Sequence, residues 1–192
     1  MTNRYTARRA AAAELDAARD VWRNANIARG KIPDAARVRR VEQKLVAAEV
    51  IVVVALDKNK IVGMALAEPG RAEDGNGPEI PGLCHISMVF VDPDYWGKRV
   101  GEILLSEVAT RAERQTLRLW TGISNERAQR LYRRAGFVPS GRTVEHAGEP
   151  IIQLERSVRI PPRVGPSDEQ PRQAADERRA EHHHDPDQLH PG

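Results

Sequence analysis

One stretch of the chain determines how the rest is interpreted, and it runs Leu83-Cys84-His85-Ile86-Ser87-Met88-Val89-Phe90-Val91-Asp92-Pro93. Its β-branched and apolar residues predict a strand over Leu83–Val91, which ends before Pro93 because proline cannot donate to a ladder. Successive side chains of a strand point to opposite faces. The even positions are all apolar and are expected to face a core: Cys84, Ile86, Met88 and Phe90. The odd positions place His85 and Ser87 on the other face, which is typical of a cleft wall or of a solvated face.

A short basic loop follows the strand and runs Asp94-Tyr95-Trp96-Gly97-Lys98-Arg99-Val100-Gly101. A helix is expected directly after it. Glycine lets the backbone approach a ligand closely, and the first amides of a helix are unpaired and partly positive. Lys98 and Arg99 add full positive charges. We therefore interpret Trp96 to Gly101 as a cradle for a diphosphate, although the loop matches neither the Walker A sequence nor the dinucleotide fingerprint.

A second informative segment runs Asn125-Glu126-Arg127-Ala128-Gln129-Arg130-Leu131-Tyr132-Arg133-Arg134-Ala135-Gly136-Phe137. Ser124 or Asn125 can cap a helix here, and Gly136 suits the left-handed position after its last turn. The buried stripe of this helix is expected to consist of Ala128, Leu131, Tyr132 and Ala135. Tyr132 is then either a packed core aromatic or a phenol that donates a proton.

Strands and helices alternate in the rest of the pattern. Helices are expected over Glu14–Asn24, from near Pro33 to near Glu49, over Glu102–Arg114 and over Asn125–Ala135. Strands are expected over Tyr5–Arg9, Val50–Leu56, Ile61–Ala67, Leu117–Thr121, from Phe137 onward and over Pro150–Val158. The segment Pro69–Pro81 is rich in glycine and proline and is expected to be a long loop. The order predicts a single mixed α/β domain over residues 1–158.

The composition changes after Ser157. The segment 159–192 holds six of the thirteen prolines and no aromatic residue, so it cannot bury enough apolar area to offset its ordering entropy. We predict a disordered polar tail there. The tail carries a charge of −2 against +3 for the whole chain, which leaves the domain near +5. Its histidines, His182-His183-His184 and His190, have no well-spaced partner, so no metal site is expected.

Several classes of protein do not fit the composition. No stretch approaches the ~20 apolar residues of a membrane helix, and the segment Met1–Tyr5 lacks the apolar run of a signal peptide. Cys84 is the only cysteine, so no internal disulfide can form and a cytoplasmic location is expected. Few aromatic residues and no basic stripe argue against a nucleic-acid binder.

The two informative segments together resemble the GNAT superfamily of acyl-CoA-dependent N-acyltransferases. The residues from Trp96 to Gly101 are similar to its CoA pyrophosphate motif, Q/R-x-x-G-x-G/A, with Trp96 in place of Gln or Arg and Arg99 in place of the first glycine. The segment Asn125–Phe137 is similar to its N-x-x-A-x-x-L-Y-x-x-x-G-F segment. The resemblance covers about residues 3–158. It implies a central, mixed and mostly antiparallel sheet of six or seven strands flanked by about four helices.

The resemblance also implies roles for particular residues. Acetyl-CoA would be the co-substrate, without a metal, and Tyr132 would protonate the leaving thiolate as the general acid. His85 stands where the family often has a carboxylate base, although a water chain can serve instead. A structural histidine is an equally weighted alternative. His146 is a weaker candidate, and direct transfer leaves Cys84 without a role as nucleophile. The residues implied to bind the cofactor are Val89, Phe90, Val91, Trp96, Gly97, Lys98, Arg99, Val100, Gly101 and Asn125.

The expected activity is transfer of an acetyl group to a primary amine by direct attack in a ternary complex. The acceptor, a small molecule or a protein, is expected to contact the first two helices, the Asn26–Pro33 connection and the Pro69–Pro81 loop. The alternative is a non-catalytic acyl-CoA-binding sensor or an interaction module on the same fold. Neither nucleic acid nor membrane is an expected partner, and a monomer and a homodimer are both compatible with the sequence.

Overall fold

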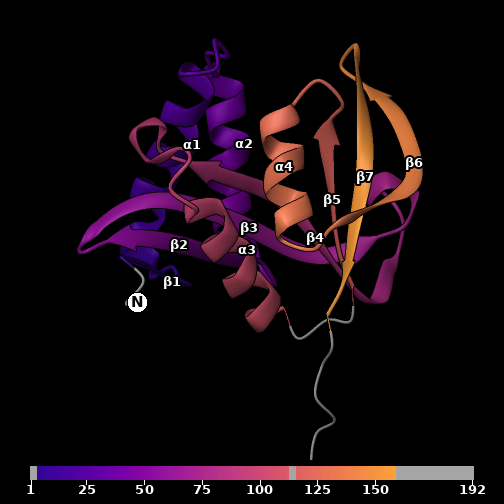
Figure 1. Ribbon diagram of the computed structural model, residues 1–192, viewed down its shortest axis with the longest axis horizontal. Helices are drawn as coiled ribbons and strands as arrows, with labels where there is room; N and C mark the ends of the chain where they lie inside the picture. Colours follow the sequence, from indigo (N-terminus) through magenta and orange to yellow (C-terminus); the bar gives the residue numbers. More distant parts are fainter. Residues whose placement is uncertain (1–3, 113–115, 159–192) are drawn as a thin grey trace, which may run out of the picture. The chain divides into compact units, whose positions relative to one another are not determined.

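A computed structural model describes residues 4–112 and 116–158. Its seven strands form one sheet in the order β1-β2-β3-β4-β5-β7-β6. The strands are β1 (Tyr5–Arg9), β2 (Ile51–Asp57), β3 (Lys60–Arg71), β4 (Glu79–Val91), β5 (Thr116–Gly122), β6 (Val138–His146) and β7 (Glu149–Ser157). The helices are α1 (Leu15–Ile27), α2 (Ala35–Leu45), α3 (Val100–Arg111) and α4 (Glu126–Arg134), with short 3-10 turns at Ala12–Glu14, Glu73–Gly75 and Pro93–Tyr95. The predicted α+β class and element order are confirmed, and the predicted tail lies outside the described residues (Figure 1).

The sheet is covered on both faces. Val53 and Ala55 of β2 belong to the core under α3, whereas Val52 and Val54 belong to the core under α1 and α2. A strand that is buried on both faces reads as a continuous apolar run, which explains the unbroken sequence of β2. The prediction that α4 packs through an apolar stripe is also confirmed, because Ala128, Leu131, Tyr132 and Ala135 all pack on the α3 side.

A β-bulge changes the predicted facing of β4. Leu66 of β3 pairs with Met88, but the next residue, Ala67, pairs with Ile86, so Ser87 is an extra residue in the ladder. One extra residue turns every later side chain to the opposite face. Cys84 and Ile86 therefore face the α3 core as expected, whereas Met88 and Phe90 face the α1 core, which corrects the prediction of one shared face.

The β4–β5 pair is parallel and short. Only Leu83, Cys84 and His85 of β4 pair with β5, at Thr116, Leu117 and Arg118. Beyond that point β5 continues as an antiparallel partner of β7 as far as Gly122. The two central strands therefore part after His85, and the later half of β4 has no strand neighbour on that side among the described residues.

The predicted long loop Pro69–Pro81 is shorter than expected. β3 continues to Arg71 and β4 starts at Glu79, so the connection spans residues 72–78. The ladder is irregular between Pro69 and Arg71, and such an irregularity accommodates a residue without an N–H. The rule that proline and glycine break strands therefore fails locally.

The start of α2 also differs from the prediction. Pro33 precedes the helix, and Asp34 is the N-cap, whose carboxylate accepts a hydrogen bond of 2.6 Å from the Arg37 amide. Aspartate satisfies the unpaired amides of the first turn better than a helix start at Pro33 would. The helix ends at Leu45, four residues before the predicted end.

Gly63 lets α3 approach the sheet closely. A Cβ at this position would lie 2.9 Å from Val100 Cγ1 and 3.0 Å from Leu104 Cδ1. We expect Gly63→Ala to lower the free energy of unfolding by about 1–3 kcal/mol, because overpacking displaces the first turns of α3. Urea denaturation measures this change. Gly122→Ala is the control, because its new Cβ would have ordinary contacts of 3.8 Å and more, and equal losses in both variants would contradict the prediction.

No helix in residues 4–112 and 116–158 combines the length and the apolar character needed to cross a membrane.

Candidate active site

A cleft of about 360 Å³, here named the α4 cleft, opens between the later half of β4, the N-terminus of α3 and α4. Nine of the residues singled out from the sequence line it: Val89, Val91, Trp96, Gly97, Arg99, Val100, Gly101, Asn125 and Tyr132. The bulge at Ser87 turns Val89 and Val91 toward this cleft. The structure therefore brings the loop, the strand edge and the helix of the two sequence segments together.

The loop before α3 has the backbone conformation of a glycine-rich turn. Gly97 has φ +76°, and Arg99, the N-cap of α3, has φ +62°. Both values lie in the left-handed region, where a side chain costs about 1–2 kcal/mol. Arg99 thus takes the conformation that a glycine would take without strain, so the turn before α3 is kept although the first motif glycine is absent.

Trp96 is fixed by two contacts. Its indole N–H donates a hydrogen bond of 2.8 Å to the Val91 carbonyl oxygen. The guanidinium carbon of Arg127 lies 3.6 Å from the centre of the Trp96 ring, a close cation–π stack. Trp96 therefore ties the loop to the end of β4 and holds an arginine of α4 over the cleft.

The α4 cleft is strongly basic. Five arginines and one glutamate are among its lining residues: Arg29, Arg99, Arg127, Arg130, Arg134 and Glu102. Burial lowers the pKa of the Arg29 guanidinium and the positive charge of Arg127 lowers it further, while burial also lowers the pKa of Arg127. Arg29 donates to the neutral Ala25 carbonyl at 3.1 Å, which does not compensate its charge. Arg130 lies 3.2 Å from Glu126 and Arg134 lies 3.9 Å from Glu102, so Arg29 and Arg127 are the partly desolvated cations that favour an anionic ligand.

Tyr132 lies at the inner end of the cleft. It is 8% exposed and packs edge-to-face on Phe137, with ring centroids 6.0 Å apart. Burial raises the pKa of the Tyr132 phenol to about 12, and the nearby Arg29 charge opposes this shift in part. The phenol therefore keeps its proton at neutral pH and can donate it.

The ends of α4 agree with the sequence. Asn125 caps the helix, because its side-chain oxygen accepts a hydrogen bond of 3.2 Å from the Ala128 amide. Gly136 has φ +83°, as predicted for the left-handed position after the helix.

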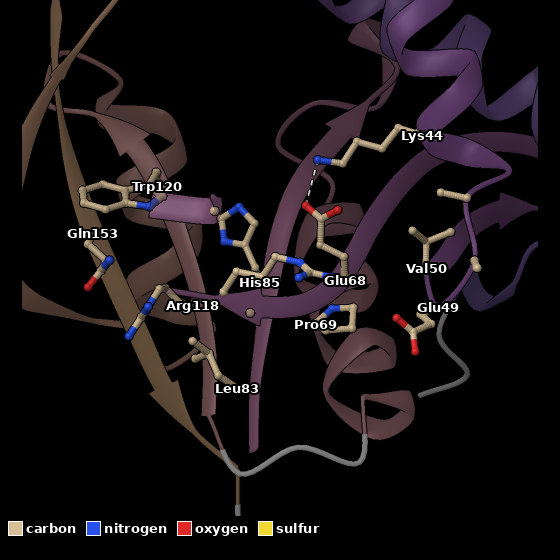
Figure 2. A pocket seen from close by; sticks show the side chains of 15 residues that line it. Lys44, Glu49, Val50, Glu68, Pro69, Leu83, His85, Arg118, Trp120 and Gln153 are labelled. Atoms are coloured by element: carbon tan, nitrogen blue, oxygen red, sulfur yellow. Dashed lines mark ion pairs between the residues drawn. The ribbon is translucent and has the colours of Figure 1, made fainter. Parts of the chain in front are cut away.

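A second cavity of about 360 Å³, here named the α2 pocket, lies on the opposite side of the sheet, beside the end of α2. Figure 2 shows Lys44 and Glu68 on one wall, His85 in the centre, and Arg118, Trp120 and Gln153 on the other wall.

His85 stands in a row of charged residues on four strands. It pairs in register with Glu68 on β3 and with Arg118 on β5, and Arg118 pairs with Glu155 on β7. Lys44 Nζ lies 2.7 Å from the Glu68 carboxylate, and Arg118 Nε donates to Glu155 at 2.8 Å. Burial lowers the pKa of the His85 imidazole, Glu68 raises it, and Lys44 and Arg118 lower it. The net direction is downward, so His85 is neutral at pH 7 and can accept a proton.

Other residues singled out from the sequence lie elsewhere. Phe90 is turned toward α1, where the Arg29 guanidinium carbon lies 5.1 Å from its ring centre. Lys98 is placed over the Tyr95 ring, at 4.9 Å. His146 is exposed at the end of β6, and the buried Cys84 faces the α3 core. None of these three positions (Phe90, Lys98 and His146) is among the lining residues of either cavity.

Comparisons with known proteins agree with this arrangement. Residues 16–137 match the family described as Acetyltransferase (GNAT) family. Over 58 residues the chain is 36% identical to an uncharacterised N-acetyltransferase from Methanocaldococcus jannaschii; the match spans 29% of this chain and 26% of that protein.

Solved structures share the fold. A GNAT-family acetyltransferase from Bacillus cereus superposes with a TM-score of 0.64 at 19% identity, over 81% of this chain and 99% of that one. The PaiA N-acetyltransferase from Thermoplasma acidophilum, in complex with coenzyme A, gives a TM-score of 0.58 at 13% identity, over 80% and 98%. With its cleft, its sheet and its matched residues 16–137, the chain belongs to the GNAT family of acetyltransferases.

Proposed function

We propose that this enzyme transfers the acetyl group of acetyl-CoA to a primary amine by direct attack in a ternary complex. The observation that carries the proposal is the partly desolvated arginine cluster beside the N-terminus of α3, at the point where β4 has lost its strand neighbour. Coenzyme A has a diphosphate and an extended arm with amide groups. The basic loop suits the former, and the free edge of β4 suits the latter.

The loop and α4 would bind the phosphates. The amides of Gly97, Arg99, Val100 and Gly101 would serve as donors, whereas the Lys98 amide already donates to the Tyr95 carbonyl at 3.4 Å. Arg127, stacked on Trp96, adds a fixed positive charge. The edge of β4 at Val89 and Val91 would pair with the arm as an added strand. An amide near Val89 would then donate to the thioester oxygen, where negative charge develops during attack.

The proton steps follow from the two cavities. The amine nitrogen attacks the thioester carbon, the C–S bond breaks, and the Tyr132 phenol gives its proton to the departing sulfur. The nitrogen loses one proton, and neutral His85 would accept it. β4 and β5 part directly after His85, so an acyl group held along β4 would lie between the α4 cleft and the α2 pocket.

Calorimetry with acetyl-CoA, followed by a thiol-release assay over a panel of amines, tests the proposal. We expect saturable binding and amine-dependent release of CoA. Absence of acetyl-CoA binding would overturn the proposed function. Binding without turnover of any amine would favour the second candidate, a non-catalytic acyl-CoA-binding module, which the replacements at Trp96 and Arg99 motivate.

Arg127 provides a prediction that concerns binding alone. We expect Arg127→Met to raise the Kd of acetyl-CoA roughly ten- to a hundredfold, because a charge-assisted contact to phosphate is lost, and to reduce the salt dependence of binding. Calorimetry at two salt concentrations measures both quantities. Arg23→Met, on the exposed side of α1, is the control for the loss of one positive charge. An equal Kd in the two variants would show that Arg127 does not contact the phosphates.

A further inference from the structure

The α2 pocket contains a buried hydrogen-bond donor without a partner. Gln153 on β7 is 2% exposed, and its side-chain nitrogen Nε2 has no hydrogen-bond partner among the described residues. Its side chain lines the pocket beside Trp120, its register partner on β5. Nε2 itself has almost no exposed surface. Because buried polar groups are nearly always paired, a side-chain adjustment that lets a ligand in the pocket complete this amide would be favourable.

A neighbouring hydroxyl fixes the orientation of this amide. Ser140 Oγ lies 2.9 Å from Gln153 Oε1, and Oγ also accepts a hydrogen bond of 3.3 Å from the Arg142 amide. The Ser140 hydroxyl donates to Oε1 in this arrangement, so the NH₂ group of Gln153 is turned the other way. In Figure 2 the amide nitrogen lies on the side nearer His85 and the oxygen on the far side.

The charges of the pocket indicate what the donor would bind. Arg118, near Gln153, is already neutralised by Glu155 at 2.8 Å, so this wall has no uncompensated positive charge for a carboxylate. A neutral carbonyl oxygen accepts from Gln153 Nε2 without the cost of burying a charge.

The opposite wall suits the amine. Glu68 and His85 are register partners on β3 and β4, and the Lys44 ammonium compensates the charge of the Glu68 carboxylate. Because Lys44 neutralises Glu68, this wall carries no uncompensated charge either, and it suits an amine that reaches His85 in its unprotonated form. The pocket thus presents a place for an amine and, across the strands, a donor for a neutral carbonyl.

We infer that the acceptor is an amino carboxamide: a primary amine delivered to His85, joined by a short chain to an amide carbonyl that accepts a hydrogen bond from Gln153 Nε2. This inference rests on the proposed function and adds the class of its second substrate. A free small amide and the end of a peptide share this chemistry.

A series of compounds of increasing chain length tests whether the acceptor is an amino carboxamide. It consists of ω-amino carboxamides, H₂N–(CH₂)n–CONH₂ with n from one to five, each beside the matched ω-amino acid and the n-alkylamine of equal length. We expect wild type to prefer the carboxamide over both matched compounds by about tenfold in kcat/KM at one or two chain lengths. N-terminally free dipeptides of matched spacing separate the two sources of the amide.

Variants at Gln153 connect the preference to this residue. In Gln153→Met, and in the double variant Ser140→Ala/Gln153→Met, which also removes the hydroxyl left unpaired, the ratio of carboxamide to alkylamine is expected to fall to about one. Gln43→Met, at an exposed glutamine of α2, is expected to keep the wild-type ratio. Thermal melting confirms that each variant is folded.

Three results would overturn the inference: equal kcat/KM for carboxamides and alkylamines in wild type, a ratio that survives in both Gln153 variants, or turnover of no carboxamide at all. Acetyl-CoA binding, measured in the same preparations, distinguishes failure of the acceptor class from failure of the proposed function. If acetyl-CoA binds and other amines are acetylated, only the acceptor class is wrong; if acetyl-CoA does not bind, the proposed function fails with it.

Discussion

Tyr132→Phe is expected to lower kcat by about a hundredfold or more while changing the Kd of acetyl-CoA little, because the variant lacks only the phenolic hydroxyl that we propose as the proton donor to the leaving thiolate. Burial raises the pKa of this phenol to about 12, so the proton-donating form persists across the usual assay range. The loss of activity is therefore expected to be the same from about pH 7 to about pH 10. Single-turnover measurements of CoA release test this directly.

The matched control changes the packing around Tyr132 and leaves its phenolic hydroxyl in place. Phe137→Leu disturbs the ring that contacts Tyr132 at 6.0 Å but keeps the phenol, so its kcat is expected to stay much closer to wild type. Should Tyr132→Phe retain the wild-type kcat at every pH, Tyr132 would be a core aromatic only.

His85→Gln is expected to lower kcat by about a hundredfold through the loss of the base. Burial lowers the pKa of His85 below its ordinary value of about 6.5, and the base acts in its neutral form. In wild type, kcat/KM should therefore rise with pH as His85 loses its proton, at a pH below 6.5. At higher pH, where His85 is already neutral, it should add no further change. In the variant this step should disappear, and the rate should follow the supply of unprotonated amine. A pH–rate profile from about pH 5 to about pH 10 measures both.

Two neighbours of His85 supply controls with opposite signs. Glu68 stabilises the imidazolium, so Glu68→Gln is expected to move the acidic step to lower pH. Lys44 destabilises it, so Lys44→Met is expected to move the step to higher pH. A step that remains at the wild-type pH in both variants would assign it to another group and leave His85 as a structural histidine.

Local patterns predicted the elements of the fold well, because each is determined by residues close together in the sequence. The cap at Asn125 and the left-handed Gly136 follow from short-range backbone chemistry. The bulge at Ser87 could not be predicted in this way, because the strand sequence alternates normally and only the pairing of Leu66 and Ala67 on β3 reveals the extra residue.

The residues that line the two cavities were likewise predictable only where they lie close together in the sequence. Trp96, Gly97 and Gly101 were found because they lie in one short loop. Arg29 and Gln153 were missed, since each reaches its cavity from an element distant in sequence, and a single arginine or glutamine gives no signal alone. Arg127 lies within the quoted motif, where its stack on Trp96 could have been suspected from the unusual tryptophan.

Because Ser87 is an extra residue in the ladder, odd-numbered side chains of β4 face opposite sides of the sheet before and after it. Before it, odd-numbered side chains such as His85 line the α2 pocket; after it, odd-numbered side chains such as Val89 line the α4 cleft. Deleting Ser87 would turn the side chains on one side of it to the opposite face of the sheet, whereas replacing Ser87 would leave them where they are. Deletion of Ser87 is therefore expected to disturb both cavities more than replacement of Ser87 by another residue.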